Sequence, residues 1–182
     1  DNGNITHFMP DSKDEYAINN DNIYDIDIDN HNRIWVATYG GGVNLIDERQ
    51  GKIRFINATN QLSNYPLKKF HSVRRITHTA KGEMILSTTG GLVTFSGQFV
   101  SPLKIKFFKN SHITGDTASL STSDVMQTLV TSCGDIYTIT LGGSLQRVAS
   151  KSLLTDNIRF ATTGVDSDEG LLQAMTEDSD AY

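Results

Sequence analysis

The sequence predicts an all-β fold, a β-propeller fragment with about three complete blades of four antiparallel strands each. The main observation is an internal repeat, in which an apolar strand ends in Thr and paired glycines follow one residue later. The three copies run over residues 34–41, 84–91 and 136–143, so the glycine pairs begin at residues 40, 90 and 142. A period near 50 residues made of short strands is typical of a propeller blade, because solenoid repeats are generally shorter and mostly helical.

A turn residue that recurs in the same register is the second observation. Asn32, Gly82 and Gly134 each stand eight residues before a glycine pair. Asn and Gly are residue types that accept a positive φ in a hairpin turn, so they predict a hairpin between the first two strands of every unit. Trp35 and Ile85 follow this turn at equivalent positions, and we expect Trp35 to pack between blades.

Apolar positions and further glycines predict the other strands. The first strand of each unit carries apolar groups to bury, at Ile23 and Ile26, at Val73 and Ile76, and at Val125 with the poorer Thr128. The third strand opens at Val43, Val93 and Leu145, which aligns the units without a gap. A fourth strand is suggested by Gly3–Ile5, Gly51–Ile53 and Gly97–Phe99. Helical patterns are nearly absent.

The repeat register divides residues 1–182 into parts of one partial propeller. Residues 1–20 hold an outer strand of a preceding blade and a connection, and residues 171–182 begin a next blade. Complete blades are predicted at residues 21–70, 71–122 and 123–170. A propeller closes with about four to eight blades, so we expect the remaining blades of a longer protein or a second chain to complete the ring. Alone, the chain is expected to self-associate through its open faces.

Three long connections without strand character, at residues 9–22, 57–72 and 109–123, precede the first strands. In a four-stranded meander they enter at the same end as the paired glycines. Long loops on a rigid scaffold are common recognition sites, so this end is the predicted functional surface. Tyr39, beside the first glycine pair, is the candidate ligand-binding residue.

Composition and motifs exclude several classes of function. A net charge of −5 gives no basic footprint for nucleic acid, and Cys133 is the only cysteine. Asp25, Asp27 and Asp29 look like the start of a calcium loop, but the Gly and Glu that an EF-hand needs at positions six and twelve are missing. The simpler interpretation is that the first two alternate along a strand, while Asp29 caps the turn. No catalytic motif, metal spacing or phosphate loop is present, so we expect no catalytic residue, metal or cofactor.

Residues 26–47 resemble the two-component regulator propeller repeat. That repeat reads, in outline, as apolar-x-x-Asp-x-x-Gly-x-Ile-Trp-Val-Gly-Thr-x-x-Gly-Gly-Leu, and the first unit departs from it only at Asn32 and Ala37, which stand for Gly. The second unit has Ile85 in place of Trp, and the third is the most divergent, with Tyr137 at that position. Residues 8–12 and 19–23 are similar to the connection between blades in this family.

The resemblance implies a periplasmic sensor region of a Bacteroides-type hybrid two-component histidine kinase. Its usual signal is an oligosaccharide and its output is transcription, so this chain would bind ligand and carry no catalytic part. Two alternatives stay open at this point. One is a propeller that only contacts other proteins, and the other is a lyase or hydrolase on the same scaffold, since fold does not fix function.

Overall fold

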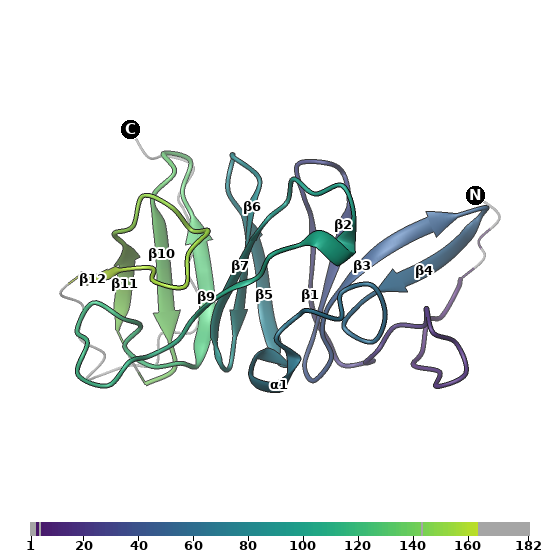
Figure 1. Ribbon diagram of the computed structural model, residues 1–182, viewed down its shortest axis with the longest axis horizontal. Helices are drawn as coiled ribbons and strands as arrows, with labels where there is room; N and C mark the ends of the chain where they lie inside the picture. The colour runs from purple at the N-terminus through teal and green to yellow at the C-terminus, as the bar shows by residue number, and fades with distance from the viewer. Residues whose placement is uncertain (1–2, 4, 143, 164–182) are drawn as a thin grey trace.

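The computed structural model describes residues 3, 5–142 and 144–163, and it is an all-β structure (Figure 1). Three four-stranded antiparallel sheets follow one another along the chain, and within each sheet the strands lie in chain order. The first sheet holds β1 (Ile23–Ile28), β2 (Ile34–Thr38), β3 (Gly42–Arg49) and β4 (Lys52–Ile56). The second holds β5 (Val73–His78), β6 (Glu83–Thr88), β7 (Gly91–Ser96) and β8 (Phe108–Asn110). The third holds β9 (Val125–Val130), β10 (Ile136–Thr140), β11 (Leu145–Val148) and β12 (Phe160–Thr162).

Helical structure in the described residues is limited to one α-helical turn, α1 (Leu67–Phe70), and one 3-10 turn (Pro102–Lys104). Neither is long and apolar enough to cross a lipid bilayer. The first strands of the sheets are neighbours, with β5 packed between β1 and β9, and the fourth strands form the far edges (Figure 1). The predicted all-β class and the three four-stranded sheets are therefore confirmed.

The hairpin turns between first and second strands share one geometry. Asn32, Gly82 and Gly134 have φ values of 57°, 78° and 85°. Each of these residues donates its backbone N–H to the carbonyl three residues earlier, at 2.8–2.9 Å. The prediction from the recurring turn residue is confirmed in all three sheets.

The glycine-pair turn is one residue shorter in the second sheet than in the first. Thr38 pairs with Gly42, whereas Thr88 pairs with Gly91. The third sheet keeps the longer spacing, since Ile139 pairs with Leu145 as Ala37 pairs with Val43. The predicted alignment of the third strands without a gap was therefore wrong. Equivalent positions are those with the same hydrogen-bonded partner on the second strand, and by that criterion Val43 corresponds to Leu92 and not to Val93.

Gly91 should not tolerate a side chain. Its φ is 130°, and a Cβ there would overlap the backbone carbonyl of Asn110 on β8. We expect Gly91→Ala to lower the free energy of unfolding by more than about 1 kcal/mol, measured by urea denaturation. Gly115→Ala is the matched control, because Gly115 also has a positive φ but open space around it. Equal losses in the two variants would contradict the close approach of β7 and β8.

One predicted fourth strand lies elsewhere, and another is not tested by the described residues. In the second sheet the fourth strand is β8, not Gly97–Phe99, because residues 97–107 make a detour that places Ile105 and Phe107 in the core. Gly3 and residues 5–8 lie outside any strand, and the preceding blade with which the predicted outer strand would pair is not among the described residues, so that strand stays a prediction. Asn4, Gly143 and the predicted next blade at residues 171–182 lie outside the described residues.

The core lies in the spaces between the sheets. Trp35 is fully buried and packs on Phe95 of the second sheet, with ring centroids 5.2 Å apart. Ile85, at the equivalent position, is buried in a second cluster with Leu120 and Val125 at the boundary with the third sheet. The expectation that Trp35 packs between neighbouring units is confirmed.

The first strand of the first sheet departs from the predicted burial. Ile26 is 61% exposed, whereas its counterpart Ile76 is only 6% exposed. Ile23 and Ile28 are exposed as well. Ile76 is covered because it faces the first sheet, but in the described residues no sheet lies on the corresponding face of β1. The prediction that Ile23 and Ile26 would be buried is wrong for this chain.

Candidate functional site

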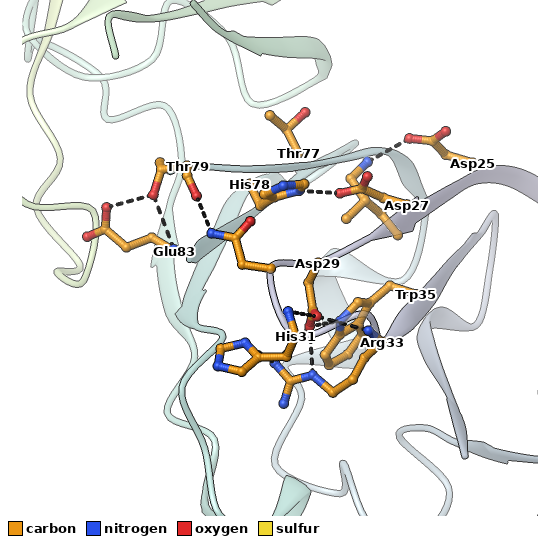
Figure 2. Close-up of polar contacts among 12 residues, drawn as sticks. Asp25, Asp27, Asp29, His31, Arg33, Trp35, Thr77, His78, Thr79 and Glu83 are labelled. Carbon is orange, nitrogen blue, oxygen red and sulfur yellow. Dashed lines mark hydrogen bonds and ion pairs between the residues drawn. The ribbon is translucent and has the colours of Figure 1, made fainter. Parts of the chain in front are cut away.

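Asp29 is the most densely hydrogen-bonded side chain at the end of β1. Its carboxylate accepts the backbone N–H groups of His31 and Arg33 at 2.8 and 3.1 Å, which makes it the predicted turn cap. It also accepts the Arg33 Nε–H at 2.7 Å and the Trp35 indole N–H at 2.8 Å (Figure 2). The indole bond was not foreseen, because nothing in the repeat pattern indicates a partner for the Trp35 nitrogen.

This environment holds Asp29 in its charged form. Burial by itself raises the pKa of Asp29. The hydrogen bonds from the Trp35 indole, the Arg33 and His31 backbone and the Arg33 side chain together outweigh burial, so the pKa of Asp29 lies below its ordinary value. A carboxylate that stays ionised and fully bonded is a structural anchor and not a proton donor.

A series of polar contacts joins β1 to β5. Asp25 accepts the Ile76 backbone N–H at 2.8 Å, and Asp27 lies 2.8 Å from His78 Nδ1 (Figure 2). The Asn30 amide donates to two carbonyls of the next hairpin turn at 3.2 Å. The alternating aspartates therefore contact the second sheet. Among the described residues no group of three or more His, Cys, Asp or Glu side chains could hold a metal ion.

Tyr39 lies in the turn between β2 and β3, next to an aromatic neighbour. Its ring stacks on Tyr24 with centroids 4.9 Å apart and planes 27° apart. The guanidinium carbon of Arg74, on β5, lies 5.7 Å from the Tyr39 ring centroid. The Tyr39 backbone N–H donates to the Asn22 carbonyl at 2.9 Å, which fixes the turn against the start of β1.

Arg74 continues this group toward the third sheet. It forms a forked ion pair with Asp124, just before β9, with N–O distances of 3.0–3.2 Å. We name Tyr24, Tyr39, Arg74 and Asp124 the rim cluster. It connects all three sheets at the end that carries the paired glycines, and it offers aromatic faces with charged groups beside them. Such a surface can stack on and hydrogen-bond a ligand, but it holds no nucleophile paired with a base.

The sequence pointed to one member of the rim cluster and missed three. Tyr39 stands beside a repeated glycine pair and was therefore noticed. Tyr24 and Arg74 occupy equivalent positions of their units, and that shared register was the available signal. Asp124 lies in the predicted third blade, and no motif around it indicates a role. A role of Tyr39 in ligand binding remains a prediction.

The chain is similar in fold to an extracellular domain from B. thetaiotaomicron, of a protein described as a hybrid two-component system. The match has 19% sequence identity and a TM-score of 0.57, and it covers 85% of this chain but 19% of that chain. A second such domain from the same organism is matched with 19% identity and a TM-score of 0.35, over 81% of this chain and 18% of that chain.

The first of these comparisons bears on the fold. At 19% identity the first match shows a shared architecture and nothing finer. No protein-family model matches the sequence, and no curated protein sequence matches it. The chain spans about a fifth of the length of the structural neighbour. The fold comparison therefore supports the architecture of this chain, and the repeat residues predict the same architecture.

Proposed function

We propose that this chain is a propeller segment in the extracytoplasmic sensor region of a two-component signalling receptor. The observation that carries the proposal is the architecture shared with the B. thetaiotaomicron extracellular domain. Within that receptor the segment contributes binding, and the phosphoryl-transfer chemistry belongs to other parts of the protein. In a Bacteroides-type cell such a segment would lie in the periplasm.

The propeller arrangement is supported by how the sheets meet. The first strands β1, β5 and β9 lie side by side, as strands around a central axis do, and each sheet runs from there to a far edge. The apolar face of β1 at Ile26 and Ile28 then receives a further four-stranded sheet, just as β5 receives the first sheet. That sheet belongs to the longer protein or to a second chain.

A ligand at the rim cluster gives the segment its sensory role. The ligand class that the resemblance to the propeller repeat favours is an oligosaccharide. The rim cluster draws its residues from all three sheets or from the segments next to them. A ligand that contacts the whole cluster therefore favours one relative arrangement of the sheets. Ligand binding shifts a receptor equilibrium by the difference in its affinity for the two states.

Signalling by the intact receptor tests this function. With a transcription reporter and a panel of oligosaccharides, we expect Tyr39→Ala to weaken the response without unfolding the chain. Lys81→Ala is the control, because Lys81 is exposed on the hairpin turn at the opposite end of the second sheet. A response that is lost with Lys81→Ala and kept with Tyr39→Ala would contradict the choice of surface. An intact receptor that responds to no oligosaccharide would contradict the ligand class.

The uncovered β1 face predicts self-association of the isolated chain. We expect light scattering to show species larger than a monomer, growing with protein concentration, because apolar side chains on this face lack a covering sheet. The double variant Ile26→Ser and Ile28→Ser should shift the distribution toward the monomer. Val100→Ser is the control, since Val100 is 99% exposed but lies in the detour after β7. A wild-type monomer at every concentration would contradict the open face.

A further inference from the structure

A β-bulge interrupts the first strand of every sheet at the same place. In β1 the pairing with β2 passes from Ile23 to Asp25, and in β5 the pairing with β6 passes from Val73 to Arg75. In β9 the pairing with β10 passes from Val125 to Gln127. The residues left out of the pairing are Tyr24, Arg74 and Met126, which are separated by the same 50 and 52 residues as the glycine pairs.

The surroundings of the bulges recur, but the bulged residues do not. Opposite each bulge the second strand carries a buried threonine, at Thr38, Thr88 and Thr140. The bulged side chains are instead a phenol, a guanidinium and a thioether. A bulge re-aims a side chain away from the regular alternation of the strand, and bulges are over-represented beside binding and active sites. The bulge therefore presents a different side chain in each sheet from the same backbone position.

Two of the three bulged side chains lie in the rim cluster. Tyr24 rests on the Tyr39 ring and is 46% exposed, so one face of its ring is covered and much of its surface is open. Arg74 lies near the Tyr39 ring and is held in place by its ion pair with Asp124. Met126 occupies the same register position in the third sheet and is partly buried.

We propose that the bulge positions Tyr24, Arg74 and Met126 are the specificity-determining ligand contacts of this segment, one from each sheet. This inference rests on the proposed function and names the residues that read the ligand. Tyr24 is the stacking platform for the apolar face of a sugar ring, and Tyr39 supports it from behind. Arg74, oriented by Asp124, donates hydrogen bonds to the ring hydroxyls, and Met126 adds an adaptable apolar contact.

These side chains could instead serve only to pack one sheet against the next. Matched variants distinguish packing from ligand contact. Arg74→Ala is compared with Arg75→Ala, because Arg75 is the next residue but pairs regularly with Ser87. Tyr24→Ala is compared with Tyr137→Ala, because Tyr137 pairs regularly in β10. Tyr24→Phe keeps the ring and removes only the hydroxyl.

The experiment measures binding of the purified chain to a printed array of defined oligosaccharides, with calorimetric titration of the tightest binder and a melting temperature for each variant. We expect Tyr24→Ala and Arg74→Ala each to weaken binding about tenfold, which corresponds to about 1.4 kcal/mol. Arg75→Ala and Tyr137→Ala should bind as the wild type does. Tyr24→Phe keeps the stacking ring, so it should lose less affinity than Tyr24→Ala. Melting temperatures of the bulge variants should stay close to that of the wild type.

Two results would overturn the inference while leaving the proposed function intact. The first is that the wild-type chain binds an oligosaccharide and that Tyr24→Ala and Arg74→Ala bind it with the same affinity. The other is a loss of binding that Arg75→Ala and Tyr137→Ala share equally, or that follows a fall in melting temperature. A wild-type chain that binds no oligosaccharide on the array would instead overturn the proposed ligand class, and the assignment of the bulges with it.

Discussion

Replacing Trp35 with alanine is expected to lower the free energy of unfolding by about 3–5 kcal/mol, because a large aromatic side chain is removed from a packed core. The indole is fully buried and contacts the rings of Phe95 and Phe99. Its removal leaves a cavity between the first and second sheets and takes one donor from Asp29. Urea denaturation followed by far-UV circular dichroism measures the loss.

Trp35→Phe is the matched variant for this prediction. It keeps most of the apolar volume but cannot donate a hydrogen bond to Asp29, so its loss should be clearly smaller than that of Trp35→Ala. If Trp35→Ala left stability unchanged and abolished ligand binding in the intact receptor, the tryptophan would be a ligand contact and not a packing residue.

Asp29→Ala should cost about 3–5 kcal/mol, because removing one partner of a buried charged network leaves the others uncompensated. The lost carboxylate accepts hydrogen bonds from two backbone N–H groups, the Arg33 guanidinium and the Trp35 indole.

The Asp29 carboxylate also makes the stability of the fold depend on pH. The pKa of Asp29 is lowered in the folded protein, so its stabilisation is complete above the unfolded pKa of about 3.9 and is lost as pH falls through the lower folded pKa.

Denaturation curves between pH 7 and about pH 2 test this dependence. The wild type should lose stability below about pH 4, and Asp29→Asn should lose less over the same interval because it has no charge to titrate. Asp21→Asn is the control, since Asp21 is exposed just before β1. If Asp29→Asn lost as much stability at low pH as the wild type, other carboxylates would be responsible for the acid sensitivity.

Local residue chemistry accounts for the parts of the fold that were predictable from sequence. Asn32 and Gly82 supply the positive φ that a tight turn needs, so the hairpins could be located without knowledge of the tertiary structure. The position of β8 could not be found this way. Residues 97–107 leave the sheet because Phe99 and Phe107 join the core beside Trp35 and Phe95, and such contacts are visible only in three dimensions.

The candidate site shows the same division. Tyr39 could be singled out because it adjoins a repeated turn. Tyr24 and Arg74 share a register position that the repeat makes visible, but the bulge that re-aims their side chains leaves no distinctive residue type in the sequence. Asp124 is 50 residues from Arg74 in sequence, and their pairing depends on how the second and third sheets meet. Burial of the β1 isoleucines was predicted from their apolar positions in the repeat, but it depends on a neighbouring sheet.

The difference in length between the glycine-pair turns has a consequence for how such repeats diverge. The second sheet has one residue fewer between Thr88 and Gly91 than the first sheet has between Thr38 and Gly42. The threonine still pairs with the first glycine of the third strand in both sheets, so the shorter turn leaves the pairing of β6 with β7 intact. Duplicated units can therefore change the length and chemistry of this turn, where Tyr39 sits in the first sheet, while their strands keep the inherited pairing. Variation concentrated in such turns and in the neighbouring bulges would let proteins of this architecture acquire new surfaces with the scaffold unaltered.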